Sequence, residues 1–336
     1  METTKRTLGR SGVEISALGM GCWAIGGPYS DGTSHYGWGD VDDAESIRGV
    51  RRALELGVTF FDTASSYGAG HSEVVLGQAL GGVRADVVVA SKWGYTFDEA
   101  SRTALGMDDS VPYLRSCLEG SLRRLGTDYV DVYQLHIGDM AIPQALEFIE
   151  PLEELVAEGK LRGYGWSTDD PERAAAFAEA GPHCVAVQYD MSVLADRPAM
   201  VETSERLGLA GIIRGPLAMG LLSGKYADGR AVAANDIRAM DVPWMTYFQA
   251  GAGAPEWVAR VERLREIFAT GGRTPAQGAL AWLWARSETA IPIPGFRSVQ
   301  QVEQNAGALE LGPLSKEEFA AVEDVLAELR GGFAAE

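Results

Sequence analysis

The feature that most constrains the fold is a regular alternation of short apolar runs with amphipathic segments along most of the chain. Eight candidate strands end at Gly21, Asp62, Lys92, His136, Ser167, Tyr189, Arg214 and Gly295. The run VVVA at 87–90 is apolar at every position, as expected for a strand that is covered on both faces. Strands that alternate with helices form parallel sheets, and eight such units close into a barrel. We therefore predict an α/β fold, a single (β/α)8 TIM barrel in one domain spanning residues 1–336.

Local signals predict the ends of helices and the irregular parts of the chain. Ser110, Asp170 and Thr274 are each followed within two residues by proline, a combination typical of helix N-termini. The first 15 residues predict a β-hairpin that plugs one end of the barrel. The stretches 24–41 and 218–254 are rich in glycine and aperiodic, and loops of such length at the carboxyl-terminal face of a barrel usually serve as functional lids.

The composition excludes several classes of protein. With 336 residues, 46% of them hydrophobic, the chain can bury a large core, which excludes a disordered or fibrous protein. Its formal charge of −18 provides no basic field for nucleic acid or an anionic membrane. No segment is long and apolar enough to span a membrane or to serve as a signal peptide. We expect a cytoplasmic protein with no nucleic-acid, membrane or metal partner and with reduced thiols at Cys22, Cys117 and Cys184.

Polar residues stand at or next to six of the predicted strand ends, where the active site of a TIM barrel is built. They are Asp62, Lys92, His136, Ser167 with Thr168, Gln188 and Arg214. A single lysine at a strand end is most often a surface or ion-pair residue. Burying six polar ends without a ligand, however, would cost several kcal/mol of desolvation free energy. Their convergence therefore predicts a ligand site at the carboxyl ends of the strands.

Four residues in this region predict acid–base chemistry. Tyr67 follows Asp62 by five residues, so a loop can return its hydroxyl over the barrel mouth. The ammonium of Lys92 is expected to lower the pKa of Tyr67, and Asp62 is expected to keep Lys92 protonated. His136 can donate a hydrogen bond to a substrate carbonyl. This arrangement predicts a proton donor beside a bound electrophile.

Seven segments resemble, in order and spacing, the signature segments of the aldo-keto reductase superfamily, most closely its bacterial members and the potassium-channel β subunits. They are DTASSYG, VVASKWG, YQLH, GYGWST, VQYD, IIRGPLAMGLLSGKY and IPGFRSVQQVEQN, and they cover almost the whole chain. The resemblance implies NADPH-dependent reduction of a small aldehyde or ketone to an alcohol, with hydride from the nicotinamide. It also implies a catalytic tetrad of Asp62, Tyr67, Lys92 and His136, in which Tyr67 is the general acid.

The resemblance further implies a cofactor site along the strand ends. The positions that hold the nicotinamide carboxamide match Ser167, Thr168 and Gln188, although asparagine is more usual where Thr168 stands. The pyrophosphate positions match Gly215, Pro216, Leu217 and Lys225. The adenosine positions match Gly295, Arg297, Gln301, Gln304 and Asn305, with Gln304 in place of a more usual glutamate. In this alignment Arg297 meets the 2′-phosphate that distinguishes NADPH from NADH.

Several residues near the predicted mouth are expected to shape the ligand site. Arg214 stands where many relatives place an aromatic residue on the nicotinamide; its planar guanidinium can also stack but adds positive charge. The segment GMGCWA resembles a dinucleotide-binding glycine loop but does not open the helix that such a loop requires. We interpret it as a strand end, and Cys22 and Trp23 are expected to face the cofactor. Trp23, Trp38 and Trp93 flank the mouth and are expected to form the substrate wall.

Two other functions are open to a chain of this pattern. Channel β subunits use the same barrel as a nucleotide-bound regulatory partner, although His136 favours an enzyme. A lyase in which Lys92 forms a Schiff base with a carbonyl substrate is the other alternative. It is disfavoured by Asp62, which would keep the amine of Lys92 protonated.

Overall fold

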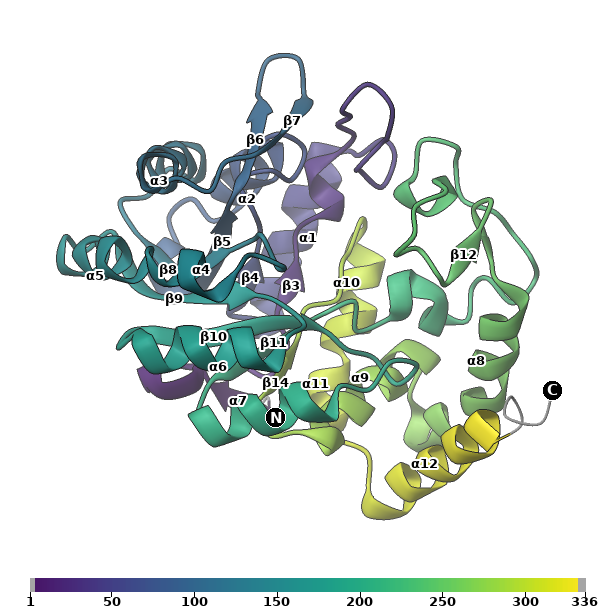
Figure 1. The fold of residues 1–336 in the computed structure, drawn as a ribbon. Helices are drawn as coiled ribbons and strands as arrows, with labels where there is room; N and C mark the ends of the chain where they lie inside the picture. Colours follow the sequence, from purple (N-terminus) through teal and green to yellow (C-terminus); the bar gives the residue numbers. More distant parts are fainter. Residues whose placement is uncertain (1–3, 332–336) are drawn as a thin grey trace.

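The computed structural model describes residues 4–331, and at its centre eight parallel strands curl into a barrel (Figure 1). In chain order they are β3 (Met20–Gly21), β4 (Phe60–Asp62), β5 (Val88–Trp93), β8 (Val130–Leu135), β9 (Leu161–Ser167), β10 (Cys184–Asp190), β11 (Ala210–Arg214) and β14 (Ala290–Pro292). The first and last strands meet where the amide of Gly19 donates to the carbonyl of Pro292 at 2.9 Å. The predicted (β/α)8 fold is therefore confirmed. The predicted domain, 1–336, runs past this range, and residues 1–3 and 332–336 lie outside the described part.

Helices surround the barrel. They are α1 (Asp43–Glu55), α2 (His71–Ala79), α3 (Val111–Leu125), α4 (Ile142–Leu146), α5 (Ile149–Ala157), α6 (Pro171–Ala180), α7 (Pro198–Leu207), α8 (Pro255–Phe268), α9 (Pro275–Arg286), α10 (Val299–Ala306), α11 (Ala308–Leu311) and α12 (Lys316–Gly331). Two of them, α8 and α12, pack on α9 and on each other. Ser110, Asp170 and Thr274 cap α3, α6 and α9 as predicted, each accepting a backbone N–H of the first turn. Among the helices of residues 4–331, none combines the length and apolarity that crossing a membrane requires.

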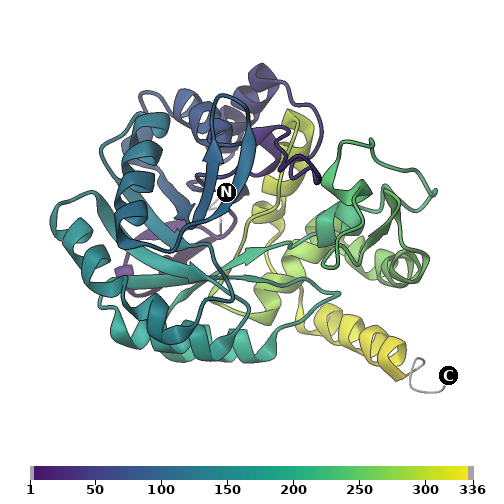
Figure 2. The same ribbon diagram turned by 45° about the horizontal axis from the view of Figure 1, so that its top comes forward.

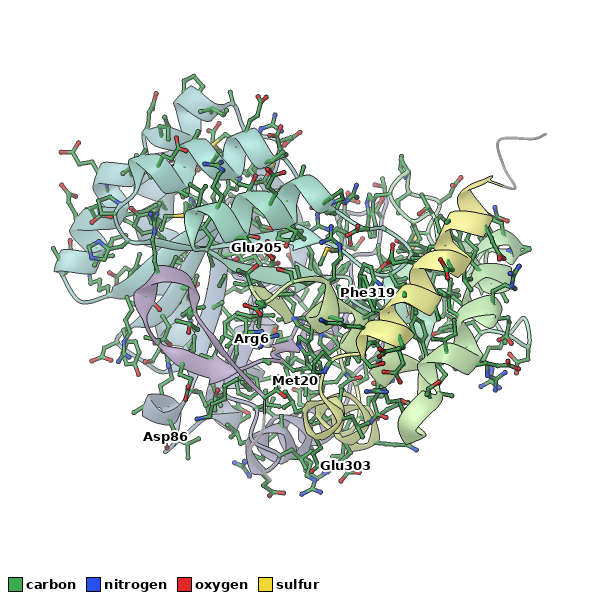
Figure 3. The ribbon with its side chains drawn as sticks, turned by 90° about the horizontal axis from the view of Figure 1, so that it is seen from below. Arg6, Met20, Asp86, Glu205, Glu303 and Phe319 are labelled. Carbon is green, nitrogen blue, oxygen red and sulfur yellow. The ribbon has the colours of Figure 1, made fainter. Side chains whose placement is uncertain are left out.

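A hairpin closes the amino-terminal end of the barrel. Its antiparallel strands are β1 (Lys5–Thr7) and β2 (Glu14–Ser16). Leu8 and Ile15 are buried against the lowest layer of barrel side chains, which includes Phe60, Val132 and Ile212. Figure 3 views this underside, with the labelled Arg6 in its middle region. The predicted plug is present, so a ligand reaches the barrel from the opposite end.

Three segments surround the opposite end, which faces the viewer more directly in Figure 2. The two predicted loops, 24–41 and 218–254, are mostly irregular. The third segment is a hairpin that the sequence pattern does not reveal. The short strands in this region are β6 (Tyr95–Asp98) and β7 (Thr103–Met107) of that hairpin, and β12 (Phe248–Gln249) and β13 (Ala252–Gly253) of the second loop. These segments turn the mouth of the barrel into a deep cavity.

The two long loops are joined to each other across one side of the mouth. The amide of Ile237 donates to the carbonyl of Gly37 at 2.8 Å. Trp38 and Asp236 pair in an isolated antiparallel bridge one residue further on each side. We call residues 24–41 and 218–254 together the strap.

Candidate active site

Asp62, Tyr67 and Lys92 converge at the floor of the cavity. The Nζ of Lys92 lies 2.5 Å from Oδ1 of Asp62, 2.8 Å from the carbonyl oxygen of Thr63 and 3.2 Å from Oη of Tyr67. The three N–H groups of the ammonium thus have three acceptors. Lys92 is 0% exposed and Asp62 is 1% exposed, so the ion pair is fully buried. Its position at the ends of β4 and β5 holds the cation directly beneath the Tyr67 hydroxyl.

His136 is the fourth member of the group that the sequence predicts, and it lies beside Tyr67. Its ring meets the Tyr67 ring edge-on, with 5.8 Å between the ring centres, and meets Tyr95 in the same way at 5.1 Å. Burial and the positive charges of Lys92 and Arg214 hold the pKa of His136 well below its usual range. The imidazole is therefore neutral near pH 7, and its N–H can donate to a carbonyl oxygen in the cavity.

The pKa of Tyr67 differs from the expectation. Burial raises this pKa above its ordinary value, while the charge of Lys92 acts in the opposite direction. The effect of Lys92 has the predicted sign, but the loss of water around the phenol outweighs it. For Lys92, burial lowers the pKa, but the attraction of Asp62 and Tyr67 is stronger, so the pKa lies above the usual range. Near neutral pH the site thus holds an ammonium beside a protonated phenol.

One cavity of about 2010 Å³ joins these residues to the far side of the barrel mouth. The cofactor-matched residues on its wall are Cys22, Trp23, Ser167, Gln188, Arg214, Gly215, Pro216, Leu217, Lys225, Gly295, Arg297, Gln301, Gln304 and Asn305. Pockets for a single small ligand usually measure roughly 300–1,000 Å³. The cavity is therefore large enough for a dinucleotide and a small substrate side by side.

Thr168, the remaining residue of the predicted cofactor set, lies behind the wall. Its side chain is buried, and its hydroxyl donates to the carbonyl of Gly138 at 2.7 Å. The predicted contact of Thr168 with the carboxamide is therefore not supported, because this bond holds the hydroxyl against the backbone.

Two arginines on the wall have partners that the sequence does not predict. The Nη2 of Arg214 lies 2.5 Å from Oδ2 of Asp169, so an acidic neighbour offsets the positive charge of this arginine. Arg297 donates through Nη2 to the carbonyl of Asp40, in the first loop of the strap. Both guanidinium groups thus reach the cavity from fixed positions.

Of the three tryptophans expected to form the substrate wall, two lie on it. The ring of Trp23 meets Trp38 edge-on at 5.4 Å and stacks on Tyr67 at 5.9 Å, and both tryptophans line the cavity. The prediction for Trp93 is wrong. Its ring is fully buried and stacks on Tyr133 at 4.8 Å. Successive side chains of a strand point to opposite faces, so Lys92 points into the barrel and Trp93 points out toward the helices.

Other residues of the wall escape the sequence analysis. Tyr29, Tyr95, Leu105, Met107 and Trp244 line the cavity, and Leu105 and Met107 are 64% and 61% exposed. These residues lie in the loops and in the β6–β7 hairpin, whose positions over the mouth depend on long-range packing. Periodicity in the sequence carries no signal for them.

Gln134 also escapes it, although a signal is present. It is a fully buried amide in the otherwise apolar end of β8, and it shares the barrel-facing side with Val132. Its Nε2 donates to Oδ2 of Asp62 at 3.1 Å. A polar side chain on an inward-facing strand position, two residues before His136, would have marked it as part of the site.

Comparisons with known proteins give a consistent result. Residues 17–327 match the profile described as Aldo/keto reductase family. The chain is 32% identical over 307 residues to probable aldo-keto reductase 1 of Glycine max, a match that covers 90% of this chain and 83% of that one. Its structure is similar to the glycerol dehydrogenase AKR11B4 from Gluconobacter oxydans, with a TM-score of 0.80, 27% identity and coverage of 98% and 96% of the two chains. It is also similar to an aldo-keto reductase from Klebsiella pneumoniae in complex with NADPH, with a TM-score of 0.68, 26% identity and coverage of 97% and 95%.

Proposed function

The chain belongs to the aldo/keto reductase family, and on this basis we propose that it uses NADPH to reduce the carbonyl group of a small aldehyde or ketone to an alcohol. The observation that carries the proposal is the 3.2 Å contact between Nζ of Lys92 and Oη of Tyr67 at the floor of the cavity, with the ring of His136 beside it. A protonated phenol, an ammonium and an imidazole N–H in one place can polarise a carbonyl oxygen and protonate it.

The residues of the cavity fit NADPH. Lys225 and Arg297 place two cations on the wall of a cavity in a chain whose formal charge is −18, and such cations are the usual partners of phosphate groups. We assign Gly215, Pro216, Leu217 and Lys225 to the pyrophosphate, and Gly295, Arg297, Gln301, Gln304 and Asn305 to the adenosine end. Ser167 and Gln188 would hold the carboxamide. The NADPH complex of the Klebsiella pneumoniae relative supports this choice of cofactor.

Each residue of the tetrad then has a defined task. When bound, NADPH supplies a hydride to the carbonyl carbon. His136 donates a hydrogen bond to the carbonyl oxygen, and Tyr67 transfers its Oη proton to that oxygen as negative charge develops on it. Lys92 stabilises the phenolate that remains on Tyr67, and Asp62 holds Lys92 in its charged form. Trp23, stacked on the Tyr67 ring, limits the orientations of the phenol.

The geometry disfavours a Schiff-base lyase. An imine requires a neutral, free amine to attack the substrate carbonyl. In this structure the amine of Lys92 has three hydrogen-bond acceptors and a pKa above its usual range. Its nitrogen therefore has no lone pair available in the cavity near neutral pH.

The proposal is tested by mixing the protein and NADPH with a panel of aldehydes, ketones and keto-sugars. NADPH absorbance should decay with at least one of them, and one alcohol should form for each NADPH oxidised. Tight binding of NADPH without turnover of any compound would favour the nucleotide-bound regulatory function instead. A protein that neither binds nor oxidises NADPH would contradict both carbonyl reduction and the regulatory function.

A further inference from the structure

Two buried glutamine side chains connect the catalytic carboxylate to the wall of the cavity. Gln134 on β8 is 0% exposed and Gln188 on β10 is 1% exposed. Both donate through Nε2 to Oδ2 of Asp62, at 3.1 Å from Gln134 and 2.7 Å from Gln188. The Nε2 of Gln188 also lies 3.3 Å from Oε1 of Gln134. Both hydrogens of the Gln188 amide are therefore used inside the protein.

This network determines which end of Gln188 faces the cavity. Asp62 accepts from the nitrogen of Gln134, so the oxygen of Gln134 points toward Gln188. Gln188 must then present its nitrogen to two acceptors. A reversed Gln188 amide would place its oxygen against two other oxygens in a buried site, with no proton between them, which is strongly unfavourable.

The consequence is a fixed acceptor on the cavity wall. Gln188 lines the cavity, whereas Gln134 lies behind it. With the Gln188 nitrogen turned inward, Oε1 is the atom of this amide that is left to accept a hydrogen bond from a ligand. A primary carboxamide offers such a donor, whereas a ketone or an ester in the same place does not.

We propose that Gln134 is a positioning residue for the cofactor: it orients the Gln188 amide so that Oε1 accepts a hydrogen bond from the carboxamide nitrogen of NADPH. The inference rests on the proposed function, because it requires NADPH in this cavity. Gln134 itself does not touch the cofactor. The other oxygen of Asp62 binds Lys92 at 2.5 Å, so the same carboxylate anchors both the amide network and the ammonium of Lys92.

The test compares the binding of NADP⁺ with that of its 3-acetylpyridine analogue, in which a methyl group replaces the carboxamide NH₂. Binding is followed through tryptophan fluorescence, since Trp23 and Trp38 line the cavity. The wild type should bind NADP⁺ about fivefold more tightly than it binds the analogue, a difference that corresponds to one neutral hydrogen bond. Gln134→Met keeps the length of the side chain but not its polar atoms and leaves Asp62 as the remaining acceptor of the Gln188 nitrogen, so the preference should fall to about twofold.

Three further variants separate orientation from general loosening of the barrel. Val132→Ala alters the same face of β8 one layer lower, outside the network, and should keep the wild-type preference. Gln188→Met should lose the preference, and adding Gln134→Met to it should change the preference no further.

The possible results distinguish the two proposals. A Gln134→Met variant that is folded and keeps the wild-type preference would overturn the role of Gln134, as would a wild type without any preference. If Gln134→Met does not fold, Gln134→Glu decides: it keeps an oxygen facing the Gln188 nitrogen in either protonation state, so a folded Gln134→Glu variant without the wild-type preference would overturn the role. A wild type that binds neither NADP⁺ nor NADPH would instead remove the proposed function.

Discussion

The guanidinium carbon of Arg238 lies 4.7 Å from the centre of the Trp38 ring, so a cation from one loop of the strap covers an indole from the other. Arg238 is only 5% exposed, and its Nη2 lies 2.7 Å from Oδ2 of Asp236. Its Nη1 donates to Oη of Tyr226 at 2.6 Å. These contacts fasten the strap beside the cavity, because Trp38 and Arg238 both belong to the cavity wall.

We predict that NADPH protects the strap from proteolysis. Arg230 lies in the 218–254 loop with a side chain that is 62% exposed, so trypsin should cut there well before it cuts at the buried Arg238. A ligand that binds beneath the strap stabilises its closed form, so cleavage at Arg230 should slow as NADPH is added. The fragments are identified by mass, and the Arg230→Gln variant, which removes the cleavage site, verifies the assignment. Equal cleavage rates with and without NADPH would contradict a closing role for the strap.

The variant Tyr67→Phe should lose about 10²–10⁴-fold in kcat/KM for carbonyl reduction, because only the proton donor is removed. The ring remains to stack on Trp23, so the Kd for NADPH should change less than about twofold. Reduction of 4-nitrobenzaldehyde measures the first quantity and fluorescence titration the second. Wild-type reduction rates in this variant would show that Tyr67 is not the acid.

The variant Lys92→Met should lose both activity and stability. The carboxylate of Asp62 stays buried without its cation, which typically costs about 3–5 kcal/mol of unfolding free energy, measured by urea denaturation. The double variant Asp62→Asn/Lys92→Met removes both charges and should regain much of that stability while remaining inactive. A single variant as stable as the wild type would argue against a strong buried ion pair.

The pH dependence follows from the directions of two pKa shifts. In the mechanism that we propose, reduction needs neutral His136 and protonated Tyr67. The pKa of His136 is depressed, so activity is lost only when the pH falls well below 6.5; the pKa of Tyr67 is raised, so activity is lost only when the pH rises above 10.0. We expect kcat/KM to be flat from about pH 6 to about pH 9. A titration of kcat/KM inside that range that disappears in His136→Gln would disagree with the direction given for His136.

The variant Arg297→Ala should raise the KM for NADPH about tenfold or more and leave the KM for NADH nearly unchanged. The reason is the loss of a charge-assisted hydrogen bond to the 2′-phosphate, worth about 1.5–3 kcal/mol. Arg52→Ala is a matched control, because Arg52 pairs with Glu303 on α10 but does not line the cavity. In Arg52→Ala the ratio of the KM for NADPH to the KM for NADH should equal that of the wild type. An equal loss for both cofactors in Arg297→Ala would mean that this residue does not recognise the phosphate.

The sequence predicts the parts of this molecule that depend on neighbours along the chain. Seven of the eight strand ends follow from periodicity to within one residue, whereas the last strand ends at Pro292 and not at Gly295. A barrel brings strand ends such as Asp62 and Lys92 to one face because of its topology. The orientation of Trp93 was also within reach, since strict alternation along β5 places it opposite Lys92. A residue near the mouth of a barrel does not necessarily face it.

Other features depend on contacts that no local pattern encodes. The buried Arg238 contacts Trp38 only because two loops that are distant in the sequence pack together. The residues next to Arg238 along the chain do not distinguish it from an exposed arginine. The β6–β7 hairpin likewise reaches the cavity through tertiary packing. The pKa of Tyr67 differs from the expectation because burial, which is a property of the folded cavity, outweighs the charge of Lys92.

The joining of β3 to β14 has a consequence for how the chain folds. The Gly21–Gly295 bridge links residues from near the two ends of the chain, so this part of the barrel can close only after almost all of the polypeptide has been synthesised. Contacts of such high sequence separation carry a large loop-closure entropy and slow folding. Until then, β3 presents an unpaired edge that favours aggregation. Because Gly295 and Arg297 arrive at this last step, a nascent chain acquires the part of the cavity that we assign to adenosine only on completing the barrel.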